Sequence, residues 1–311
     1  MKKKHFFLTG GTGFIGSNIS KMLIERGHRV TIYDNNARGS LEKISSIISK
    51  VKFIKGDIRN QKKVLESMAN KKIDAVIHLA YVNGTKFFYS KPELILEIAV
   101  KGLFNVIDGC MKNNIKEFYL ASSSEVYQTP LKIPTDENEM LKIPDIMNPR
   151  YSYGGGKIIS ELLCINYGKK FFKKMIIFRP HNVYGKNMGN EHVIPEFINR
   201  FRNFKGKFFN IQGSGEETRS FIYISDFIKA FELILKKGKH LNIYNIGTSE
   251  EIKIKNLALM ISNFLNLKIK IRKTSLQPGS SLRRCPKISK IKKLGFKQKI
   301  KILDGLHKTI F

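Results

Sequence analysis

The sequence predicts an α/β protein in which a doubly wound parallel sheet, with helices on both faces, precedes a smaller C-terminal α/β lobe. Short apolar runs alternate with segments of helical spacing over residues 1–180. A glycine-rich turn, Thr9-Gly-Gly-Thr-Gly-Phe-Ile-Gly16, lies between the first run and the first helix. After residue 180 the alternation loosens into loops rich in glycine and asparagine, which indicates a second lobe over residues 181–311.

The elements of residues 1–180 follow from the spacing of apolar residues. Segment 14–26 has apolar residues at helical spacing directly after the glycine turn, so it is predicted to be the first helix. Segments 92–114 and 153–172 are predicted to be long helices on the same grounds. Short apolar runs bounded by turn or charged residues predict strands at 5–9, 29–34, 51–55, 73–80, 117–122 and 175–180.

The second lobe is predicted to contain shorter elements and to return one strand to the main sheet. No internal repeat or low-complexity linker separates it from the first part. The shorter elements are expected at residues 195–202, 208–212, 224–236 and 256–265.

Composition limits the class of protein. The 311 residues are 42% hydrophobic, which is ordinary for a globular chain. No apolar run approaches the roughly 20 residues that cross a bilayer, and the charged and apolar start runs directly into the glycine turn. We therefore expect a cytoplasmic protein without membrane contact. The three cysteines lack metal-ligand spacing, so no metal is expected and the thiols are interpreted as reduced packing residues.

The net charge of +31 raises the question of nucleic-acid binding. The lysines are spread over the whole chain, without a basic tail or a basic stripe that alternates with aromatic residues. A solvated, lysine-rich surface is the preferred interpretation, and no nucleic-acid partner is expected. Part of the charge could attract an anionic diphosphate substrate.

The glycine turn predicts a dinucleotide site. Gly10, Gly13 and Gly16 stand between a predicted strand and a predicted helix, where glycines permit a tight turn and a close approach of backbone to pyrophosphate. Phe14 and Ile15 open the helix whose N-terminus then faces the phosphates.

A carboxylate at the end of the second strand predicts which dinucleotide binds. Asp34 can accept hydrogen bonds from the adenosine ribose and repel a 2′-phosphate, which favours NAD over NADP. Asp57, at the end of the third strand, and Ile58 beside it are expected against the adenine. Asn35, Arg38, Leu79 and Ala80 complete the predicted cofactor site.

Tyr153 and Lys157 are the predicted proton-transfer pair. Four residues make about one helical turn, so the ammonium is expected beside the phenol. A nearby cation, together with the positive ring of the oxidised nicotinamide, favours the phenolate and makes Tyr153 a base near neutrality. The intervening Gly154, Gly155 and Gly156 cost a helix about 1 kcal/mol each against alanine, and are interpreted as letting sugar or nicotinamide approach.

These motifs together resemble one family. The chain is similar to the extended short-chain dehydrogenase/reductases, and within them to the nucleotide-sugar epimerases and dehydratases with a Rossmann domain. Tyr81 and Gln128 depart from the small residues common at their positions. The resemblance rests on the glycine turn, Asp34, Gly56-Asp57, His78-Leu-Ala80, Ser122-Ser-Ser-Glu-Val-Tyr127, Tyr153-x-x-x-Lys157, Arg179-Pro-His-Asn-Val-Tyr-Gly185, Gly213-x-Gly-x-x-x-Arg219 and Arg283-Arg284.

The resemblance implies roles for residues at matching positions. Ser123 would hydrogen-bond the 4-hydroxyl of the sugar, Tyr153 would deprotonate it, and NAD would take the hydride from C4. Lys157 would hold the nicotinamide ribose. A homodimer, built by packing helices 92–114 and 153–172 of two subunits, is also implied. Substrate contacts would come from Ser124, Asn182, His192, Val193, Arg219 and Arg283.

The reaction that follows C4 oxidation stays open at this level. An epimerase needs no further acid or base, whereas a 4,6-dehydratase needs a carboxylate such as Glu125. Ser124 stands where one dehydratase group has an acid, and the basic groups that a C6-decarboxylating enzyme needs are not evident. The region around Ser123 is similar to a subgroup that includes a C4 dehydrogenase of GDP-heptose from capsule and surface-polysaccharide synthesis. The leading expectation is therefore NAD-dependent C4 oxidation of a nucleotide sugar, plausibly GDP-heptose, with epimerisation or dehydration as alternatives.

Overall fold

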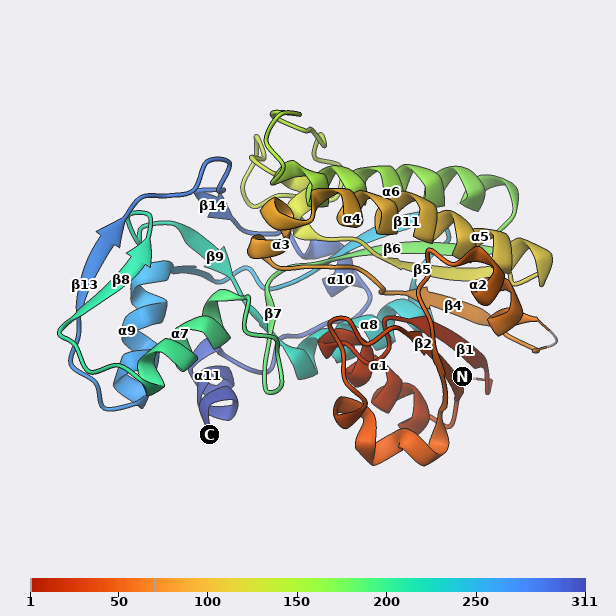
Figure 1. The fold of residues 1–311 in the computed structure, drawn as a ribbon, viewed down its shortest axis with the longest axis horizontal. Coiled ribbons are helices and arrows are strands. Elements are labelled where there is room, and N and C mark those ends of the chain that lie inside the picture. Colours follow the sequence, from red (N-terminus) through yellow and green to blue (C-terminus); the bar gives the residue numbers. More distant parts are fainter. Residues whose placement is uncertain (1, 70) are drawn as a thin grey trace.

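A seven-stranded parallel sheet forms the centre of the molecule (Figure 1). The computed structural model describes residues 2–69 and 71–311. The strand order β11-β6-β5-β4-β1-β2-β3 shows that the chain starts in the middle, winds to one edge and then crosses back to the other. The doubly wound α/β class is thus confirmed. The strands are β1 (His5–Thr9), β2 (Arg29–Asp34), β3 (Lys52–Lys55), β4 (Ala75–His78), β5 (Glu117–Ala121), β6 (Lys174–Pro180) and β11 (Asn242–Ile246).

Helices cover both faces of this sheet (Figure 1). Apolar side chains of α1 and α8 form one core layer against it, and those of α2, α5 and α6 form the other. Parallel sheets need this cover because their strands are apolar on both faces. One face carries α1 (Phe14–Glu25), the 3-10 segment η1 (Leu41–Lys50), α8 (Ile224–Lys237) and α10 (Ser289–Lys293), and the other carries α2 (Gln61–Met68), α4 (Pro92–Glu97), α5 (Leu103–Lys112) and α6 (Tyr151–Lys170).

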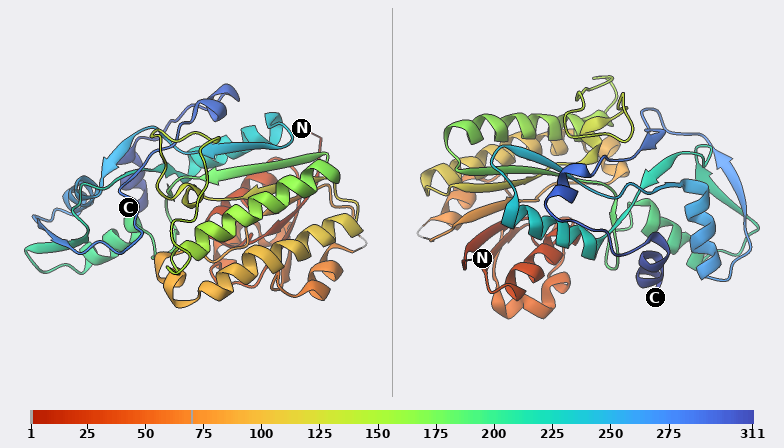
Figure 2. Two further views of the ribbon diagram at one scale, coloured as in Figure 1. Left: turned by 90° about the horizontal axis from the view of Figure 1, so that it is seen from above. Right: turned by 180° about the vertical axis from the view of Figure 1, so that it is seen from behind.

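The helix predicted over residues 92–114 changes its winding in the middle. A π-helical segment, η2 (Ile98–Gly102), joins α4 to α5. Its Ala99 carbonyl accepts a hydrogen bond from the Ser160 hydroxyl of α6 at 3.2 Å. Figure 2 shows the continuous run of α4, η2 and α5 (orange to yellow) lying beside α6 (green). Such π turns are frequent near functional sites, and this one packs η2 against the first half of α6.

The C-terminal lobe has its own core of aromatic and branched side chains and lies on the left in Figure 1. Residues after 180 also supply β11, which pairs in parallel with β6 and completes the main sheet, as the expectation of a returning strand anticipated. The lobe contains α7 (Val193–Arg202), α9 (Ile254–Phe264), α11 (Ile302–Ile310), the pairs β13 (Lys270–Thr274) with β8 (Phe208–Gln212) and β10 (Ile222–Tyr223) with β7 (Val183–Tyr184), and the three-stranded sheet β12 (Glu251–Lys253), β9 (Thr218–Ser220), β14 (Arg283–Arg284).

The predicted strand at residues 73–80 is shorter than expected. β4 ends at His78, and the chain then leaves the sheet; Leu79 lines the cleft described below, whereas the Ala80 backbone packs against Gly10. Two short elements near this cleft were not predicted, namely α3 (Thr85–Ser90) and the 3-10 turn η3 (Ser124–Tyr127). Over the residues that the structure describes, none of the helices is both long and apolar enough to span a membrane.

Candidate active site

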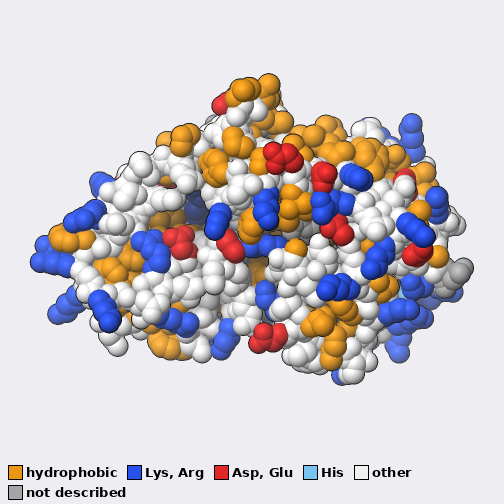
Figure 3. Space-filling view, viewed as in Figure 1, with side chains coloured by type: hydrophobic (Ala, Val, Ile, Leu, Met, Phe, Trp, Pro, Cys, Tyr) orange, Lys and Arg blue, Asp and Glu red, His pale blue; other side chains and the backbone are white. Residues whose placement is uncertain are grey.

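A cleft of about 890 Å³ lies where the carboxyl ends of the main strands face the C-terminal lobe. Parallel strands all end at one edge of the sheet, so residues far apart in sequence meet there. The cleft is lined by residues that directly follow β1 and β4, by the last residues of β5 and β6, and by parts of α1, α3, α6 and α7. Figure 3 shows the surface hollowed between the two parts of the molecule, with Lys and Arg side chains near the rim.

The glycine turn has the geometry that a dinucleotide pyrophosphate requires. Gly10 has φ +75°, and a Cβ there would lie 2.6 Å from the Ala80 backbone nitrogen. A Cβ on Gly16 would meet the Gly10 carbonyl. Gly13 lines the open cleft and caps α1 without any side-chain hydrogen bond, so the first N–H groups of α1 can donate hydrogen bonds to an anionic ligand. Phe14 and Ile15 line the cleft beside it.

Asp34 lies at the end of β2 and is buried. Its two carboxylate oxygens accept hydrogen bonds from the backbone nitrogens of Thr12, at 3.0 Å, and Asn36, at 2.8 Å. These bonds fix the carboxylate between β1 and the loop after β2, next to the glycine turn. Each oxygen keeps a further lone pair with which it can accept a ribose hydroxyl.

The residues predicted near the adenine meet only in part. The Asn35 amide donates to the Asp57 carboxylate at 3.2 Å, so these two lie together. Arg59 pairs with Asp57 at 2.9 Å; burial opposes ionisation, but Arg59 and Asn35 hold the pKa of Asp57 below its usual value. The Ile58 side chain, expected against the adenine, is instead buried in the core against Gly102. Its apolar side chain fills the space left by Gly102 in the core, so it does not line the cleft.

An ion pair connects the two sides of the cleft. Arg38, in the loop after β2, pairs through both terminal guanidinium nitrogens with Glu191 of the C-terminal lobe, at 2.7 and 2.8 Å. The same guanidinium lies over the Phe87 ring of α3, 4.8 Å from its centre. Arg38 thus lines the cleft as predicted for a cofactor residue, but Glu191, which sequence reasoning missed, determines where its charge points.

Tyr153 and Lys157 lie on the first turns of α6 and are both buried. The Lys157 ammonium donates to the Ala121 carbonyl at 2.7 Å and lies 5.9 Å from the centre of the Tyr153 ring. Burial lowers the pKa of Lys157 to about 7. Burial raises the pKa of the Tyr153 phenol above its ordinary value, and a hydrogen bond with Ser123 opposes that shift. The predicted phenolate therefore depends on the positive cofactor ring as well as on Lys157.

The loop after β5 brings Ser123 and Glu125 to the cleft beside Tyr153. The Ser123 hydroxyl accepts from the Glu125 backbone nitrogen at 3.1 Å and begins the η3 turn. The Glu125 carboxylate binds both terminal nitrogens of Arg284. Burial opposes its ionisation, but the nearby Arg284 guanidinium outweighs burial and lowers the pKa of Glu125 to about 2. Ser124, a predicted substrate contact, lines the same part of the cleft.

The prediction of Arg283 as a substrate residue is corrected by the structure. Arg283 points away from the cleft and pairs with Glu251 at 2.6 Å, whereas Arg284 lines the cleft. Successive residues of a strand point to opposite faces, and both arginines lie on β14. The sequence showed two candidates, and only the register of β14 beside β9 decides which one faces the site.

The other predicted substrate residues line the cleft from the C-terminal lobe. Asn182 donates to the Ser220 carbonyl at 2.9 Å, and His192 precedes Val193, the first residue of α7. Burial lowers the pKa of His192, and the nearby Arg38 adds to that shift. Burial also lowers the pKa of Arg219 to about 10, with Arg284 close by. Arg219 and Arg284 thus form a positive end of the cleft.

A buried network fixes the loop that carries the site. Glu161 of α6 binds Arg179 of β6 through two hydrogen bonds, at 2.8 and 2.6 Å, and also accepts the Ser122 hydroxyl. Arg179 also donates to the Tyr127 phenol at 2.7 Å, which donates in turn to Asn245 of β11 at 2.8 Å. Residues before and after Ser123 are therefore tied to α6 and to two strands of the main sheet.

The glycines between Tyr153 and Lys157 make room for two large side chains. A Cβ on Gly154 would collide with the Gln128 amide, and a Cβ on Gly156 would lie 2.5 Å from the Tyr81 hydroxyl. Gln128 and Tyr81 are the residues that replace smaller ones in the patterns this sequence resembles. Gly154 and Gly156 are therefore explained by packing within the protein, which corrects their interpretation as openings for the ligand.

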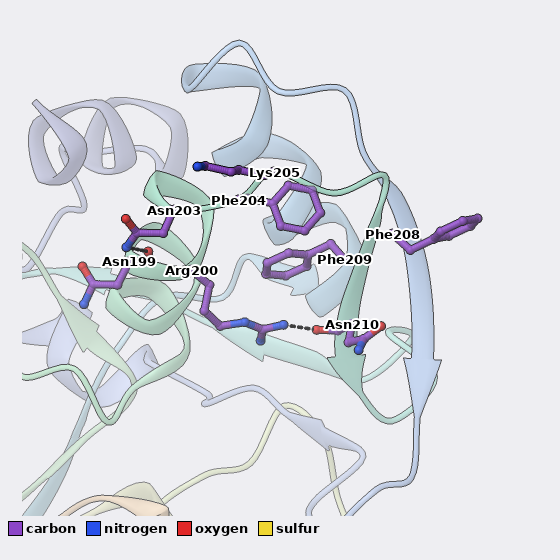
Figure 4. A pocket seen from close by; sticks show the side chains of 8 residues that line it. All are labelled: Asn199, Arg200, Asn203, Phe204, Lys205, Phe208, Phe209 and Asn210. Carbon is purple, nitrogen blue, oxygen red and sulfur yellow. Dashed lines mark hydrogen bonds between the residues drawn. The ribbon is translucent and has the colours of Figure 1, made fainter.

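A second hollow, of about 530 Å³, lies on the outer side of the C-terminal lobe between α7 and β8 (Figure 4). Arg200 crosses it, with its guanidinium 4.2 Å from the centre of the Phe209 ring and donating to the Asn210 carbonyl. The Arg200 guanidinium is therefore already paired, and the residues of the dinucleotide motif and of the Tyr153 site line the larger cleft instead.

Comparison with known proteins places this site in a family. Residues 6–247 match the model of the NAD dependent epimerase/dehydratase family. A dTDP-D-glucose 4,6-dehydratase of Dictyostelium discoideum is 32% identical over 82% of this chain, and the match spans 61% of that relative's length. A putative UDP-glucose 4-epimerase of Methanocaldococcus jannaschii is 31% identical, over 97% of this chain and 96% of the relative. The solved structure of a UDP-N-acetylglucosamine 4-epimerase from Methanobrevibacter ruminantium M1 has a TM-score of 0.87 and 28% identity, and covers 100% of this chain and 98% of that one. The chain belongs to the NAD dependent epimerase/dehydratase family, whose cofactor is NAD.

Proposed function

We propose that this protein is an NAD-dependent C4 epimerase of a nucleotide-diphosphate sugar, which oxidises C4 and reduces it again from the opposite face. The observation that carries the proposal is the pairing of Glu125 with Arg284. A carboxylate with a pKa of about 2 is a weak base, and its neighbour is Ser124 rather than a second acid. C4 oxidation needs neither a carboxylate base nor a second acid. Dehydration needs both, a base that removes the C5 proton and an acid that protonates the C6 hydroxyl.

The residues that would contact the sugar, the diphosphate and the cofactor each have a role in this scheme. Tyr153 accepts the proton of the 4-hydroxyl, and Ser123 orients that hydroxyl. The glycine turn, Gly10 to Gly16, would hold NAD, which would supply the hydride acceptor and donor for C4. Lys157 holds the ribose of the cofactor and lowers the cost of the phenolate. Arg219, with Asn182, holds the diphosphate so that only the sugar changes its orientation.

The relatives support the reaction class more than the sugar. Those compared carry dTDP and UDP names, and both epimerases and dehydratases are among them. The expectation of GDP-heptose, and of a role in capsule synthesis, remains a prediction. We test it by incubating the NAD-loaded protein with UDP-, GDP-, dTDP- and CDP-sugars, and by trapping ketones with borodeuteride before mass spectrometry. An inverted C4 centre supports the epimerase, a released 4-ketone supports the C4 dehydrogenase, and a mass loss of one water supports the dehydratase. No change in any sugar would contradict all three.

Replacing Glu125 by glutamine separates these reactions. We expect C4 oxidation to persist within about tenfold, because Tyr153 and Ser123 are unchanged. Any dehydration should fall by the 10²- to 10⁴-fold that general acid–base groups contribute. The measurement is NADH absorbance for oxidation, beside mass spectrometry for loss of water. Glu251→Gln is the matched control, since it breaks the neighbouring Arg283 pair outside the cleft. Dehydration that survives in Glu125→Gln excludes Glu125 as its base.

We also propose that the protein forms a homodimer through α4, α5 and α6. Large apolar side chains are exposed on these adjacent helices, which favours a partner of the same kind. Leu162 is the most exposed of those on α6, at 56%. Light scattering of the native protein and of Leu162→Lys tests this proposal, and a native monomer contradicts it. The exposed side chains are Leu96, Met111, Ile159 and Leu162.

A further inference from the structure

The surroundings of the Lys157 ammonium are unusual for a buried cation. Among the residues that the structure describes, no carboxylate forms a salt bridge with it. Within the described part of the chain, its one hydrogen-bond acceptor is the Ala121 carbonyl, at 2.7 Å. The face of the Tyr81 ring lies 3.7 Å from the Lys157 nitrogen, which is closer than any other aromatic ring found near it. Aromatic faces attract cations most strongly where water is excluded.

Tyr81 is held rigidly in this position. Its ring meets the Tyr153 ring edge to face, with centres 5.1 Å apart and planes at 83°. Its hydroxyl is buried next to Gly156 and, among the residues that the structure describes, has no hydrogen-bond partner. A buried hydroxyl without a partner reduces stability, so the hydroxyl does not explain the presence of a tyrosine here. The aromatic ring explains it, because the ring contacts both the Lys157 ammonium and the Tyr153 ring.

The other charged or titratable groups around Lys157 contribute little to stabilising its positive charge. His78 of β4 lies below it, and burial lowers the pKa of His78 to about 3, so this ring is neutral. On α6, Cys164 is buried, and burial raises the pKa of its thiol, so the thiol is also neutral. Glu161 attracts Lys157 from a distance, but both of its oxygens are bound to Arg179 and Ser122. Tyr153 faces it from one turn earlier on α6.

We propose that Tyr81 is a positioning residue for Lys157: its aromatic face holds the ammonium protonated and aimed along the cleft, towards Tyr153 and the cofactor. This goes beyond the proposed epimerase, because it applies to any reaction of the cleft that uses Tyr153 and Lys157. Gly156 belongs to the same arrangement, since the absence of a Cβ there lets the Tyr81 ring reach under the ammonium.

The proposal predicts a shift in the titration of Lys157. Burial already favours the neutral amine, and the ring opposes this effect. Replacing Tyr81 by leucine or methionine fills the space but removes the aromatic face. Lys157 should then lose its proton at a pH lower by about one unit, which is the change that a tenfold loss of attraction causes. Tyr81→Phe keeps the face and removes only the unpaired hydroxyl. It should titrate within a few tenths of a unit of the native protein and unfold at an equal or higher temperature.

The test needs no substrate. The NAD-loaded protein is labelled with lysine enriched in ¹³C at the ε position, and the Lys157 resonance is identified by its absence from Lys157→Met. Its titration is compared among the native protein, Tyr81→Phe, Tyr81→Leu and Tyr81→Met. The expected result is a native-like midpoint in Tyr81→Phe and a lower midpoint in both aliphatic variants. Equal midpoints in all four proteins overturn the proposal, as does a lowered midpoint in Tyr81→Phe. Because no sugar is involved, either outcome is distinct from failure of the proposed epimerase. Two aliphatic variants, Tyr81→Leu and Tyr81→Met, are used so that the test can still be made if one of them does not fold.

Turnover gives a second measurement once a substrate is known. The alkaline limb of the pH profile for NADH formation should move down by about the same amount in the aliphatic variants. A purely structural role of Tyr81 would lower the rate equally at every pH and leave the position of that limb unchanged.

Discussion

Tyr153→Phe is expected to abolish C4 oxidation while NAD still binds. Removal of a general base typically costs 10²- to 10⁴-fold in rate. The carboxylate of Glu125, which also lies close to Ser123, is paired with Arg284 and is a weak base. The phenylalanine ring keeps the stacking on Phe88, whose centre is 4.7 Å away, and the edge contact with Tyr81. The fold and the cofactor site should therefore persist. NADH formation in a single turnover measures the first effect, and calorimetric titration with NAD the second.

Tyr89→Phe is the matched control for this prediction. Tyr89 also lines the cleft, but its hydroxyl donates only to the Pro278 carbonyl, at 3.3 Å. We expect its turnover to stay within about twofold of the native protein, because an exposed hydrogen bond of this kind contributes little. Turnover retained in Tyr153→Phe would remove Tyr153 from the role of base.

Glu161→Gln is expected to have the largest effect on stability. Glu161 and Arg179 form an ion pair whose side chains are 3% and 2% exposed. Loss of one partner leaves an uncompensated buried guanidinium, which costs about 3–5 kcal/mol. For a chain of this size such a loss corresponds to a fall of roughly 5–8 °C in Tm. Thermal unfolding followed by circular dichroism measures it.

Glu216→Gln provides the comparison at the surface. Glu216 pairs with Lys253 and Lys255, yet its side chain is 46% exposed. The same substitution there should leave Tm unchanged within error, since exposed ion pairs contribute little. If both variants unfold at the same temperature, the Glu161 network does not stabilise the sheet as proposed.

The parts of the site that depend on local sequence could be predicted. Gly10, Gly13 and Gly16 are required by the backbone of one turn, and a helical spacing of four brings Tyr153 and Lys157 to one face of α6. Neither inference needs knowledge of distant residues. The alternation of apolar runs likewise predicted the main sheet, because a parallel strand that is buried on both faces has few alternatives.

The parts that depend on tertiary contacts could not be predicted. The choice between Arg283 and Arg284 rests on the register of a short strand, and one step along a strand reverses the face. The pairing of Arg38 with Glu191 joins residues 153 positions apart. The reason for Gly154 and Gly156 lies in Gln128 and Tyr81, which reach them from other loops.

The ion pair between Arg38 and Glu191 affects whether a 4-keto intermediate of the proposed reaction stays in the cleft. It connects the loop after β2 to the segment before α7. The main-sheet part of the molecule and the C-terminal lobe are thus joined by an ion pair at the cleft. A ketone formed in the cleft would have to pass this ion pair if it left on that side. For the proposed epimerase we expect this bridge to favour reduction of the ketone within the cleft over its release, which is the difference between inverting a sugar and releasing an oxidised one.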